Sequence, residues 1–468
     1  MSSDNFNITG RVLQVEVITL AVIYPLMLGG LAYVGPAFDS ARDDIRNKYP
    51  MLNFTQTIIY RDNLSYLDWL SEYENVLALY YYRIRRFSPE NPPDVTAFVM
   101  PGADAYVTGV GRFATELDKL VLTSVAQASD FRNKDKWPTW ITTGSISRAA
   151  IRTLFENLVK LYNWQTSSII CDVNSNSIFE AYSAYIRQVL QAATANAQVN
   201  RYVFDSRRID MDYEKLLQLV KDTSRVIFYW GHANALHKLL IAAFRINMTE
   251  GDYVFLAFLP FRHVSFGDFG WTEVSDNGNS REHEMSPHPT STYMTMMALA
   301  EVVEEIRTEI KSSYSSKVSV AEFGGRRCAA RFINRTFTTD QTDSLTIDQV
   351  GERIVPMAVT QLDTETGIVS VVLQQDTVQL KLRVQKRVIW PHNAWPVPAR
   401  PFCGFHGEAS ACKKSVHHSI QYGLGFGCAL LGIVVISVLF SQRMSKSLEP
   451  VKDRISWWII EPKLLRLK

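Results

Sequence analysis

Short apolar runs alternate with amphipathic stretches along most of the chain. Each apolar run is followed by a polar or glycine turn and then by apolar positions at helical spacing. The predicted pairs are strand 17–26 with helix 34–49, strand 94–102 with helix 110–120, strand 167–173 with helix 177–197, and strand 224–231 with helix 233–246. Because this order is typical of βαβ units, we expect parallel sheets with helices on their faces.

The pattern changes after the fourth pair. Residues 252–259 predict a closing strand, and residues 291–310 predict another amphipathic helix. Beyond that helix, residues 346–384 alternate apolar and polar positions as antiparallel strands and hairpins do. The sequence therefore predicts two α/β lobes with a β-rich end.

Residues 419–440 form a stretch of 22 residues without a formal charge. A helix of that length is about 33 Å long, close to the thickness of the hydrocarbon core of a membrane. A buried core helix is the alternative, but such helices rarely lack every charge over six turns. We expect one transmembrane helix here.

Charges on the two sides of this stretch predict its orientation. Only Lys413 and Lys414 lie just before it, whereas several basic residues follow it. These are Arg443, Lys446, Lys452, Arg454, Lys463, Arg466 and Lys468. The positive-inside rule places the short tail 441–468 in the cytoplasm and the N-terminal region outside, as in a single-pass type I protein of the plasma membrane.

Glycosylation motifs agree with that orientation. All N-x-S/T motifs precede the apolar stretch, at Asn7, Asn53, Asn63, Asn247 and Asn334. No secretory signal is evident, because Glu16 and Pro25 interrupt the apolar start 15–35 and no cleavage site follows it. We interpret that start as part of a buried strand in a membrane glycoprotein.

Composition limits the partners of the chain. Its 468 residues are 47% hydrophobic and 21% charged, with a formal net charge of +2, which is enough for two or three domain-sized cores. No block of Lys or Arg is evident before the tail 441–468, so we expect no nucleic-acid partner.

Cys403 and Cys412 lie close together just before the apolar stretch 419–440. Two cysteines do not complete a zinc site, and His406 between them adds only a third ligand. Their spacing is also not that of a C-x-x-C redox motif. In an oxidising compartment the simplest interpretation is a local disulfide, which stabilises the fold by about 2.7 kcal/mol in the chain-entropy model.

Two short motifs have both a chemical and a structural interpretation. GVGRFA, 109–114, matches the G-x-G-x-x-A dinucleotide fingerprint, but no strand runs directly into its first glycine, so a tight turn at a helix start is preferred. In HEMSPH, 283–288, Pro287 separates two histidines five positions apart, which predicts a polar loop rather than a zinc site. Cys171 is interpreted as a buried thiol. We expect no enzyme, no cofactor and no metal.

One segment resembles a known family. The residues VIWPHNAWPVPARPFCGFHGEASAC, followed by an apolar helix, resemble the juxtamembrane signature of natriuretic-peptide receptors and other receptor guanylate cyclases. The match is carried by Trp390, Pro391, Cys403, Gly404, Phe405 and Cys412. Weaker similarity extends through LAVIYPL with VGPAFDSA, VGRF, RVIFY, GDYVF, NRTF and DRISWWIIEPKLL, in the order of the family.

The resemblance implies a type I periplasmic-binding-protein fold, in which two lobes hinge around a cleft and the extracellular regions form a homodimer. Within a ligand-binding region at 12–400, lobe one would take 12–145 and 265–330, and lobe two 146–264 and 331–400. Residues 401–418 would be a disulfide-bonded juxtamembrane segment that transmits the motion of the lobes. A small-residue pair, Gly423 and Gly427, permits close packing between membrane helices, although glycine is common in such helices.

Some positions depart from the family pattern. Ala103 stands where the family has a cysteine, which removes an N-terminal disulfide and the basis for an anion site known near that turn in the family. Cys171 lacks an obvious partner near strand 224–231, and the interval 253–293 is short by about one strand–helix unit. The 28 residues after 440 are too few for a kinase-homology or cyclase domain.

The resulting interpretation is a single-pass receptor that binds an extracellular peptide or small molecule and signals or clears it, without catalysis. One alternative is a truncated product of a receptor guanylate cyclase, and another is a membrane-tethered small-molecule binding module. Folds of this class bind ligands at the carboxyl ends of their strands. This rule nominates Gly102, Thr143, Gly144, Asp172 and His232 for the cleft, although each also suits a turn or a helix cap.

Overall fold

The computed structural model describes residues 5–6, 11–20, 30–59, 77, 93–101, 104–124, 129–260, 266–267, 269, 287–312, 318–319, 323–339, 342–363, 366–377, 379–390, 396–410, 412 and 430–443. The chain divides into two compact units, Met1–Ala399 and Arg400–Lys468.

The first sheet of the larger unit has five parallel strands in the spatial order β3-β2-β4-β5-β6. The strands are β2 (Leu13–Leu20), β3 (Leu52–Ile59), β4 (Val95–Met100), β5 (Leu120–Thr123) and β6 (Trp140–Thr142). Strands β4, β5 and β6 are buried at every position, as expected where both faces of a parallel sheet are covered. The prediction of a parallel sheet from the first two strand–helix pairs is confirmed.

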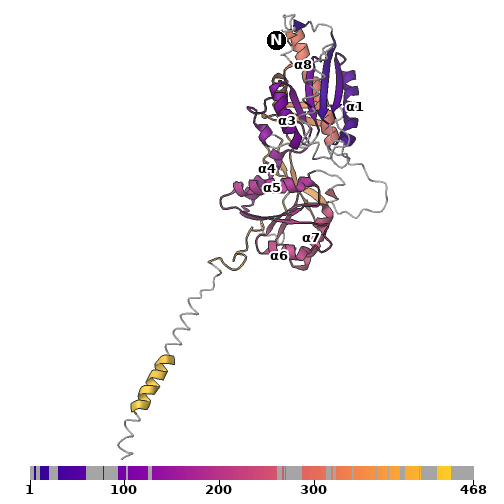
Figure 1. The fold of residues 1–468 in the computed structure, drawn as a ribbon. Helices are drawn as coiled ribbons and strands as arrows, with labels where there is room; N and C mark the ends of the chain where they lie inside the picture. Colours follow the sequence, from indigo (N-terminus) through magenta and orange to yellow (C-terminus); the bar gives the residue numbers. More distant parts are fainter. Residues whose placement is uncertain are drawn as a thin grey trace, which may run out of the picture. The chain divides into compact units, whose positions relative to one another are not determined.

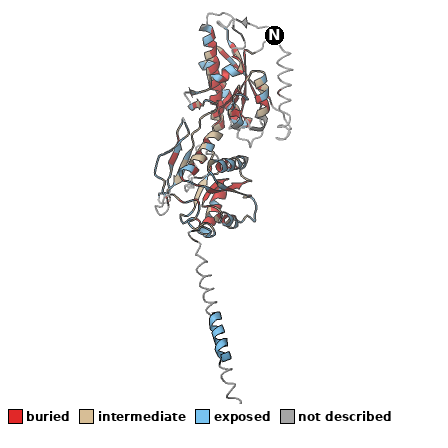
Figure 2. Ribbon diagram, turned by 90° about the vertical axis from the view of Figure 1, so that its left-hand side faces the viewer, coloured by how far each residue is buried: buried red, intermediate tan, exposed pale blue. Residues whose placement is uncertain are grey.

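Helices cover both faces of this sheet (Figure 1). One face shares a core with α1 (Leu31–Lys48) and α8 (Pro287–Ser312). The other face shares a core with α3 (Asp104–Glu116) and with the indole rings of Trp137 and Trp140. The buried residues are concentrated in the strands and on the sides of the helices that face them (Figure 2).

The second sheet has four parallel strands in the order β10-β9-β7-β8. These strands are β7 (Thr166–Asp172), β8 (Gln198–Phe204), β9 (Val226–Trp230) and β10 (Val254–Ala257). One core joins the sheet to α4 (Arg148–Leu161) and α5 (Ser177–Ala193). Another joins it to α6 (Tyr213–Lys221) and α7 (Ala233–Arg245). This sheet also confirms its predicted strand–helix pairs.

Side-chain caps define where the helices around the second sheet begin. The Ser147 hydroxyl accepts a hydrogen bond from the Ala150 amide at the start of α4, and Asp212 caps α6 in the same way. Such caps satisfy backbone N–H groups that have no partner within the helix, and each stabilises the fold by about 1 kcal/mol.

Antiparallel pairs follow the two parallel sheets in the sequence, as the alternating pattern predicts. Strand β12 (Arg335–Thr339) pairs with β13 (Thr342–Ile347). Strand β15 (Val369–Gln375) lies between β14 (Ala358–Leu362) and β16 (Leu382–Val384). The short strands β1 (Asn5–Phe6) and β11 (Val318–Ser319) also pair antiparallel.

The β-rich end contributes to the cores of both sheets. Phe337 and Leu345 belong to the core around the first sheet, whereas Val372 and Leu373 belong to the core around the second. The chain therefore passes from the first core to the second between β13 and β14. The predicted lobe boundaries, including 330/331, stay a prediction.

Two motifs adopt structures that differ from those expected. The motif GVGRFA is not a turn at a helix start, because Gly109 and Gly111 lie inside α3. A Cβ atom at Gly111 would lie 2.8 Å from the Trp140 ring and 2.9 Å from the Trp137 ring, so glycine lets the helix pack closely against both indoles. In HEMSPH, the described residues Pro287 and His288 form the first turn of α8 rather than a loop, which suits the fixed φ angle of proline.

In the smaller unit, Cys403 and Cys412 are joined by a disulfide. Within the bridged loop, the Glu408 carboxylate accepts a hydrogen bond from the His406 amide at 2.8 Å, and the Arg400 guanidinium lies 3.3 Å from it. These interactions, the amide bond first, hold the pKa of Glu408 below its usual value. Gly404 has a positive φ, and a Cβ atom there would overlap the Glu408 carboxylate.

Residues 430–443 form a helix whose side chains are exposed. Within the ranges that the structure describes, no helix is long and apolar enough to cross a membrane. Half of the predicted span, residues 419–429, lies outside the described ranges. The same holds for Gly102, Ala103, Asn7 and Asn63.

Candidate functional site at the strand ends and the crossover

Each parallel sheet has a point where the strand order reverses direction. In the second sheet the first strand, β7, lies between β8 and β9. Connections therefore leave the carboxyl ends of β7 and β9 in opposite directions, an arrangement that leaves room for a ligand. Asp172 ends β7 and His232 follows β9, and Cys171 pairs directly with Trp230 in the ladder between these strands. The topology brings the two predicted residues to one switch point.

The Asp172 carboxylate is fully buried and hydrogen-bonded. Its Oδ1 accepts bonds from the amides of Asn174 at 3.2 Å and Ser206 at 3.1 Å, and its Oδ2 accepts a bond from the Ser175 hydroxyl at 2.7 Å. Asp172 thereby connects the loop after β7 to the loop after β8. The Asp172 carboxylate therefore holds these two loops in place, which is the structural alternative, a turn residue, that the sequence also suggested.

His232 is the N-cap of α7. Its Nδ1 accepts a hydrogen bond from the Asn234 amide at 3.1 Å, so Nδ1 carries no proton and Nε2 carries it. The His232 amide donates to the Ser175 hydroxyl at 2.9 Å. Ser175 thus links Asp172 to His232, and the two predicted residues belong to one polar network.

Glycines permit the close packing around this network. A Cβ atom at Gly231 would lie 2.6 Å from the Tyr229 hydroxyl and 2.8 Å from Asp172 Cβ. Gly267 has a positive φ, and a Cβ atom there would lie 2.6 Å from the His232 ring. Any larger side chain at either glycine displaces the network.

Thr143 has a different environment at the end of β6 in the first sheet. Its hydroxyl is fully buried, donates to the Thr123 carbonyl at 2.9 Å and lies 2.5 Å from the Thr295 hydroxyl. A second hydroxyl pair, Ser124 with Thr292 at 2.8 Å, joins the same elements. Thr143 therefore ties β5 and β6 to α8. Gly144 is buried beside it.

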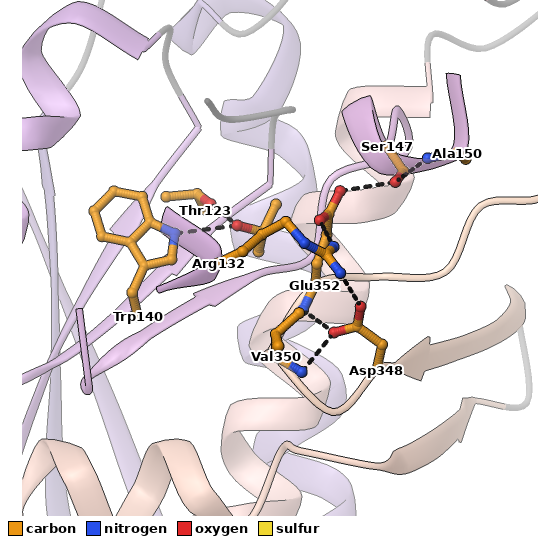
Figure 3. Close-up of polar contacts among 9 residues, drawn as sticks. Thr123, Arg132, Trp140, Ser147, Ala150, Asp348, Val350 and Glu352 are labelled. Carbon is orange, nitrogen blue, oxygen red and sulfur yellow. Dashed lines mark hydrogen bonds and ion pairs between the residues drawn. The ribbon is translucent and has the colours of Figure 1, made fainter. Parts of the chain in front are cut away.

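A polar junction forms where the chain crosses between the two cores (Figure 3). The Glu352 carboxylate accepts a hydrogen bond from the Ser147 hydroxyl at 2.7 Å and forms an ion pair with Arg132. Arg132 also donates to Asp348 at 3.1 Å. Asp348 in turn accepts bonds from the amides of Val350 at 2.9 Å and Glu352 at 2.8 Å, which closes the turn.

The backbone joins the two crossing segments at the same place. The Thr142 amide donates to the Gly351 carbonyl, and the Arg353 amide donates to the Thr142 carbonyl, each at 2.8 Å. One segment leads from β6 into α4, and the other leads from β13 to β14. Glu352, which lies in the second of these segments, thus contacts the first through Ser147.

Burial and the neighbouring carboxylates shift the pKa of Arg132 in opposite directions. Burial alone would lower the pKa of Arg132, but the facing carboxylates of Glu352 and Asp348 more than offset it, so the pKa is raised. Lys134 donates to the Trp140 carbonyl, and its burial lowers its pKa to about 8. A Cβ atom at Gly351, whose φ is positive, would lie 2.8 Å from Lys134 Nζ.

Sequence reasoning missed this junction. Arg132 and Glu352 are 220 residues apart, and no local pattern connects them. The one local signal is the polar turn 348–352, in which a glycine sits between acidic residues. Among the residues that the structure describes, no group of three or more His, Cys, Asp or Glu side chains is arranged to hold a metal ion.

Two α/β bodies with parallel sheets, linked by side-by-side crossings, define a ligand-binding module of the periplasmic-binding-protein type. Residues 33–365 match the family described as "Receptor family ligand binding region". The chain belongs to this family.

Individual relatives are distant. The chain is 22% identical to mouse "Atrial natriuretic peptide receptor 3" over 207 residues, which is 44% of this chain and 37% of that protein. It is 24% identical to the human protein of the same name over 210 residues, with the same coverage. It is 27% identical to human "Atrial natriuretic peptide receptor 2" over 245 residues, 51% of this chain and 22% of that protein. The matches thus span well under half of each relative.

Proposed function

We propose that the chain is the ligand-binding part of a cell-surface receptor, with its larger unit outside the cell. The observation that carries this proposal is the family match over residues 33–365, together with a fold that has two parallel sheets and a switch point in each. The relatives named above are receptors for a natriuretic peptide by their names, which favours a peptide ligand. In this proposal the ligand is a peptide or a small molecule. The receptor either transmits a signal when the ligand binds or removes the ligand from the extracellular fluid.

The ligand cleft in this proposal lies at the carboxyl ends of the strands, near Gly102, Thr143, Gly144, Asp172 and His232. The polar atoms of Asp172 and Thr143 already bond within the fold. Their part is therefore to position the loops that touch the ligand. Ser175, which binds both Asp172 and His232, makes the loop after β7 the part of the site most sensitive to substitution.

The crossover junction supplies the hinge in this proposal. Ligand binding changes the angle between the two bodies, and the segments at Thr142 and Glu352 absorb the change. A homodimer then carries the reorientation through the bridged segment at Cys403 and Cys412 to a single transmembrane helix at 419–440. Asn53, Asn247 and Asn334 are exposed, as glycosylation requires.

Two alternatives have distinct consequences. If the chain is part of a receptor guanylate cyclase, its natural transcript continues past Lys468 into kinase-homology and cyclase domains, and sequencing that transcript decides the matter. If it is a membrane-tethered small-molecule binder, its ligand-binding region is strictly monomeric with or without ligand. Light scattering on the glycosylated protein separates this alternative from a dimeric receptor.

Binding of labelled atrial natriuretic peptide to the full chain, displayed on cells, tests the proposal. We expect saturable binding that unlabelled peptide displaces, and at least tenfold weaker binding for Asp172→Asn, which disrupts the loop network. Asp210→Asn is the matched control, because Asp210 is exposed on the same body and pairs with its neighbour Arg208 at the surface. Absence of peptide binding to the wild type would count against the proposal. Equal binding by wild type and by a folded Asp172→Asn variant would count against the predicted site.

A further inference from the structure

Four basic residues lie within seven positions at one edge of the β14–β15–β16 sheet. They are Lys381, Arg383, Lys386 and Arg387, called the basic edge below, and all are exposed. The side chain of Arg383 is 70% exposed. Apolar residues alternate with them at Leu382 and Val384, so the group does not show as a consecutive block in the sequence. A search for a consecutive block of Lys or Arg residues therefore does not find this group.

The backbone of the basic edge is held in place along its length. The Lys381 carbonyl accepts a hydrogen bond from the Asp376 amide at 2.9 Å, and Arg383 pairs with Gln374 in the ladder with β15. The Lys386 amide donates to the Val372 carbonyl at 3.3 Å. Because these positions are fixed by the fold, only side chains must be ordered when a partner binds, which lowers the entropic cost of binding.

The charge of the basic edge is largely uncompensated. Strands β14, β15 and β16 contain no acidic residue. Asp376, in the turn before Lys381, lies 3.6 Å from Arg383, and its side chain is only 12% exposed. Over the described parts of the chain, no ion pair involves Lys381, Lys386 or Arg387. Four exposed cations, of which Arg383 alone pairs with an acid among the described residues, produce a local positive potential on a protein whose net charge is near zero.

Protection of a sheet edge is the simplest structural role for such residues, since Lys and Arg at an edge strand discourage pairing with another chain. That role explains Lys381, which precedes β16, and Arg383, which lies in it. It does not require Lys386 and Arg387, which follow the strand after a bend. A symmetric dimer through this edge is disfavoured, because it would place like charges opposite each other.

We propose that the basic edge binds a linear sulfated polysaccharide of the heparin type. Charges spread along an extended, prearranged segment match a repeating polyanion better than a single anionic group. The choice of a sulfated polysaccharide among polyanions rests on the extracellular location proposed above. The basic edge itself does not depend on that location or on the ligand of the cleft.

The test is binding of the full chain, in a mild detergent, to immobilised heparin. We expect binding that weakens steeply as salt is raised, because each contact displaces counterions. The double variant Lys386→Gln with Arg387→Gln should bind roughly 25-fold more weakly, at about fivefold for each charge beside an anionic surface. The matched control removes two exposed charges elsewhere, Lys215→Gln with Lys238→Gln, and should leave binding unchanged.

Four outcomes would overturn the proposal. The first is a wild-type chain that does not bind heparin at moderate salt. The second is equal weakening by the control pair, which would show a response to net charge alone. The third is binding of polyglutamate as tight as that of heparin, which would assign the surface to an acidic polypeptide. If the Gln variant instead self-associates while heparin binding is unchanged, edge protection is the role of these residues.

Discussion

The carboxylate of Glu352 accepts a hydrogen bond from the hydroxyl of Ser147 at 2.7 Å, although the two residues are 205 positions apart in the chain. Ser147 also caps α4 by accepting a bond from the Ala150 amide. One side chain of the second crossing segment is therefore bonded directly to the residue that starts a helix of the second sheet.

Replacing Glu352 with glutamine should destabilise the larger unit by about 1–3 kcal/mol, because the Arg132 side chain loses its closest counter-charge in a partly buried site. Urea denaturation measures the change in the free energy of unfolding. Glu156→Gln is the control, since Glu156 pairs with Arg152 across one turn of α4 and such pairs contribute only about 0.3–0.5 kcal/mol. Equal effects of the two substitutions would show that Glu352 has no special part in the crossover.

Lys134 should make stability depend on pH above neutrality. Burial lowers its pKa from 10.5 to about 8, so between these values the unfolded chain binds more protons than the folded chain. Stability contributed by this group therefore rises as the pH increases from about 8 to about 10.5, by up to about 3 kcal/mol, and is constant below that window. The Lys134→Met variant lacks this pH-dependent contribution to the unfolding free energy.

The difference in unfolding free energy between wild type and Lys134→Met, measured across that pH range, isolates the contribution of Lys134. Lys136→Met is the control, because Lys136 is half exposed and pairs with Asp130 at the surface. Parallel curves for wild type and Lys134→Met would contradict the assigned environment of Lys134.

Alanine substitutions at two helical glycines should have effects of different size. Gly111→Ala places a Cβ atom within 3 Å of two tryptophan rings and should destabilise the fold by about 1–3 kcal/mol. Gly35→Ala in α1 places a Cβ atom 3.8 Å from a Leu31 methyl group, which is ordinary contact. Its gain in helix propensity is offset because Gly35 precedes Pro36, and proline disfavours helical backbone in a preceding residue that has a Cβ atom. Thermal unfolding measures both. The midpoint should fall clearly for Gly111→Ala and change much less for Gly35→Ala, and an equal fall in both variants would contradict the packing argument.

Peptide mapping of the non-reduced protein should recover Cys403 linked to Cys412. Cys171 and Cys328 are buried, and burial raises the pKa of both thiols, to about 12 for Cys328. They should therefore react with an alkylating agent only after denaturation. Two free thiols at Cys403 and Cys412 would refute the bridge, and alkylation of Cys171 in the native protein would refute its burial.

Glycosylation tests the proposed orientation without altering an asparagine. Asn247 is exposed and has a positive φ, so the change is made at the third motif position instead. In secretory-pathway expression, Thr249→Ala should remove one glycan, seen as a mobility shift that glycosidase treatment abolishes. Thr249→Ser preserves the motif and should retain the glycan. Identical mobility of both variants would argue against an extracellular Asn247.

Much of the fold follows from local pattern. Apolar runs such as those ending at Asp172 and Trp230, each followed by an amphipathic helix, predict parallel strands because only a covered sheet buries both faces of a strand. The placement of Asp172 and His232 at one edge of the sheet also follows, because parallel strands have their carboxyl ends at the same edge. The strand order β9-β7-β8, which makes β7 and β9 neighbours, depends on the tertiary structure. Even the disulfide between Cys403 and Cys412 involves only residues that are near in sequence.

Other features depend on contacts between distant segments, and these only the tertiary structure decides. GVGRFA has the glycines of a turn, yet both lie inside α3, and Gly111 lets that helix pack closely against Trp137 and Trp140. The junction of Arg132, Ser147 and Glu352 joins segments whose separation in the sequence leaves no local signal. The sequence by itself determined which segments become strands and helices, because periodicity acts over a few residues. The tertiary structure decided which side chains meet, because packing and charge pairing act across the whole chain.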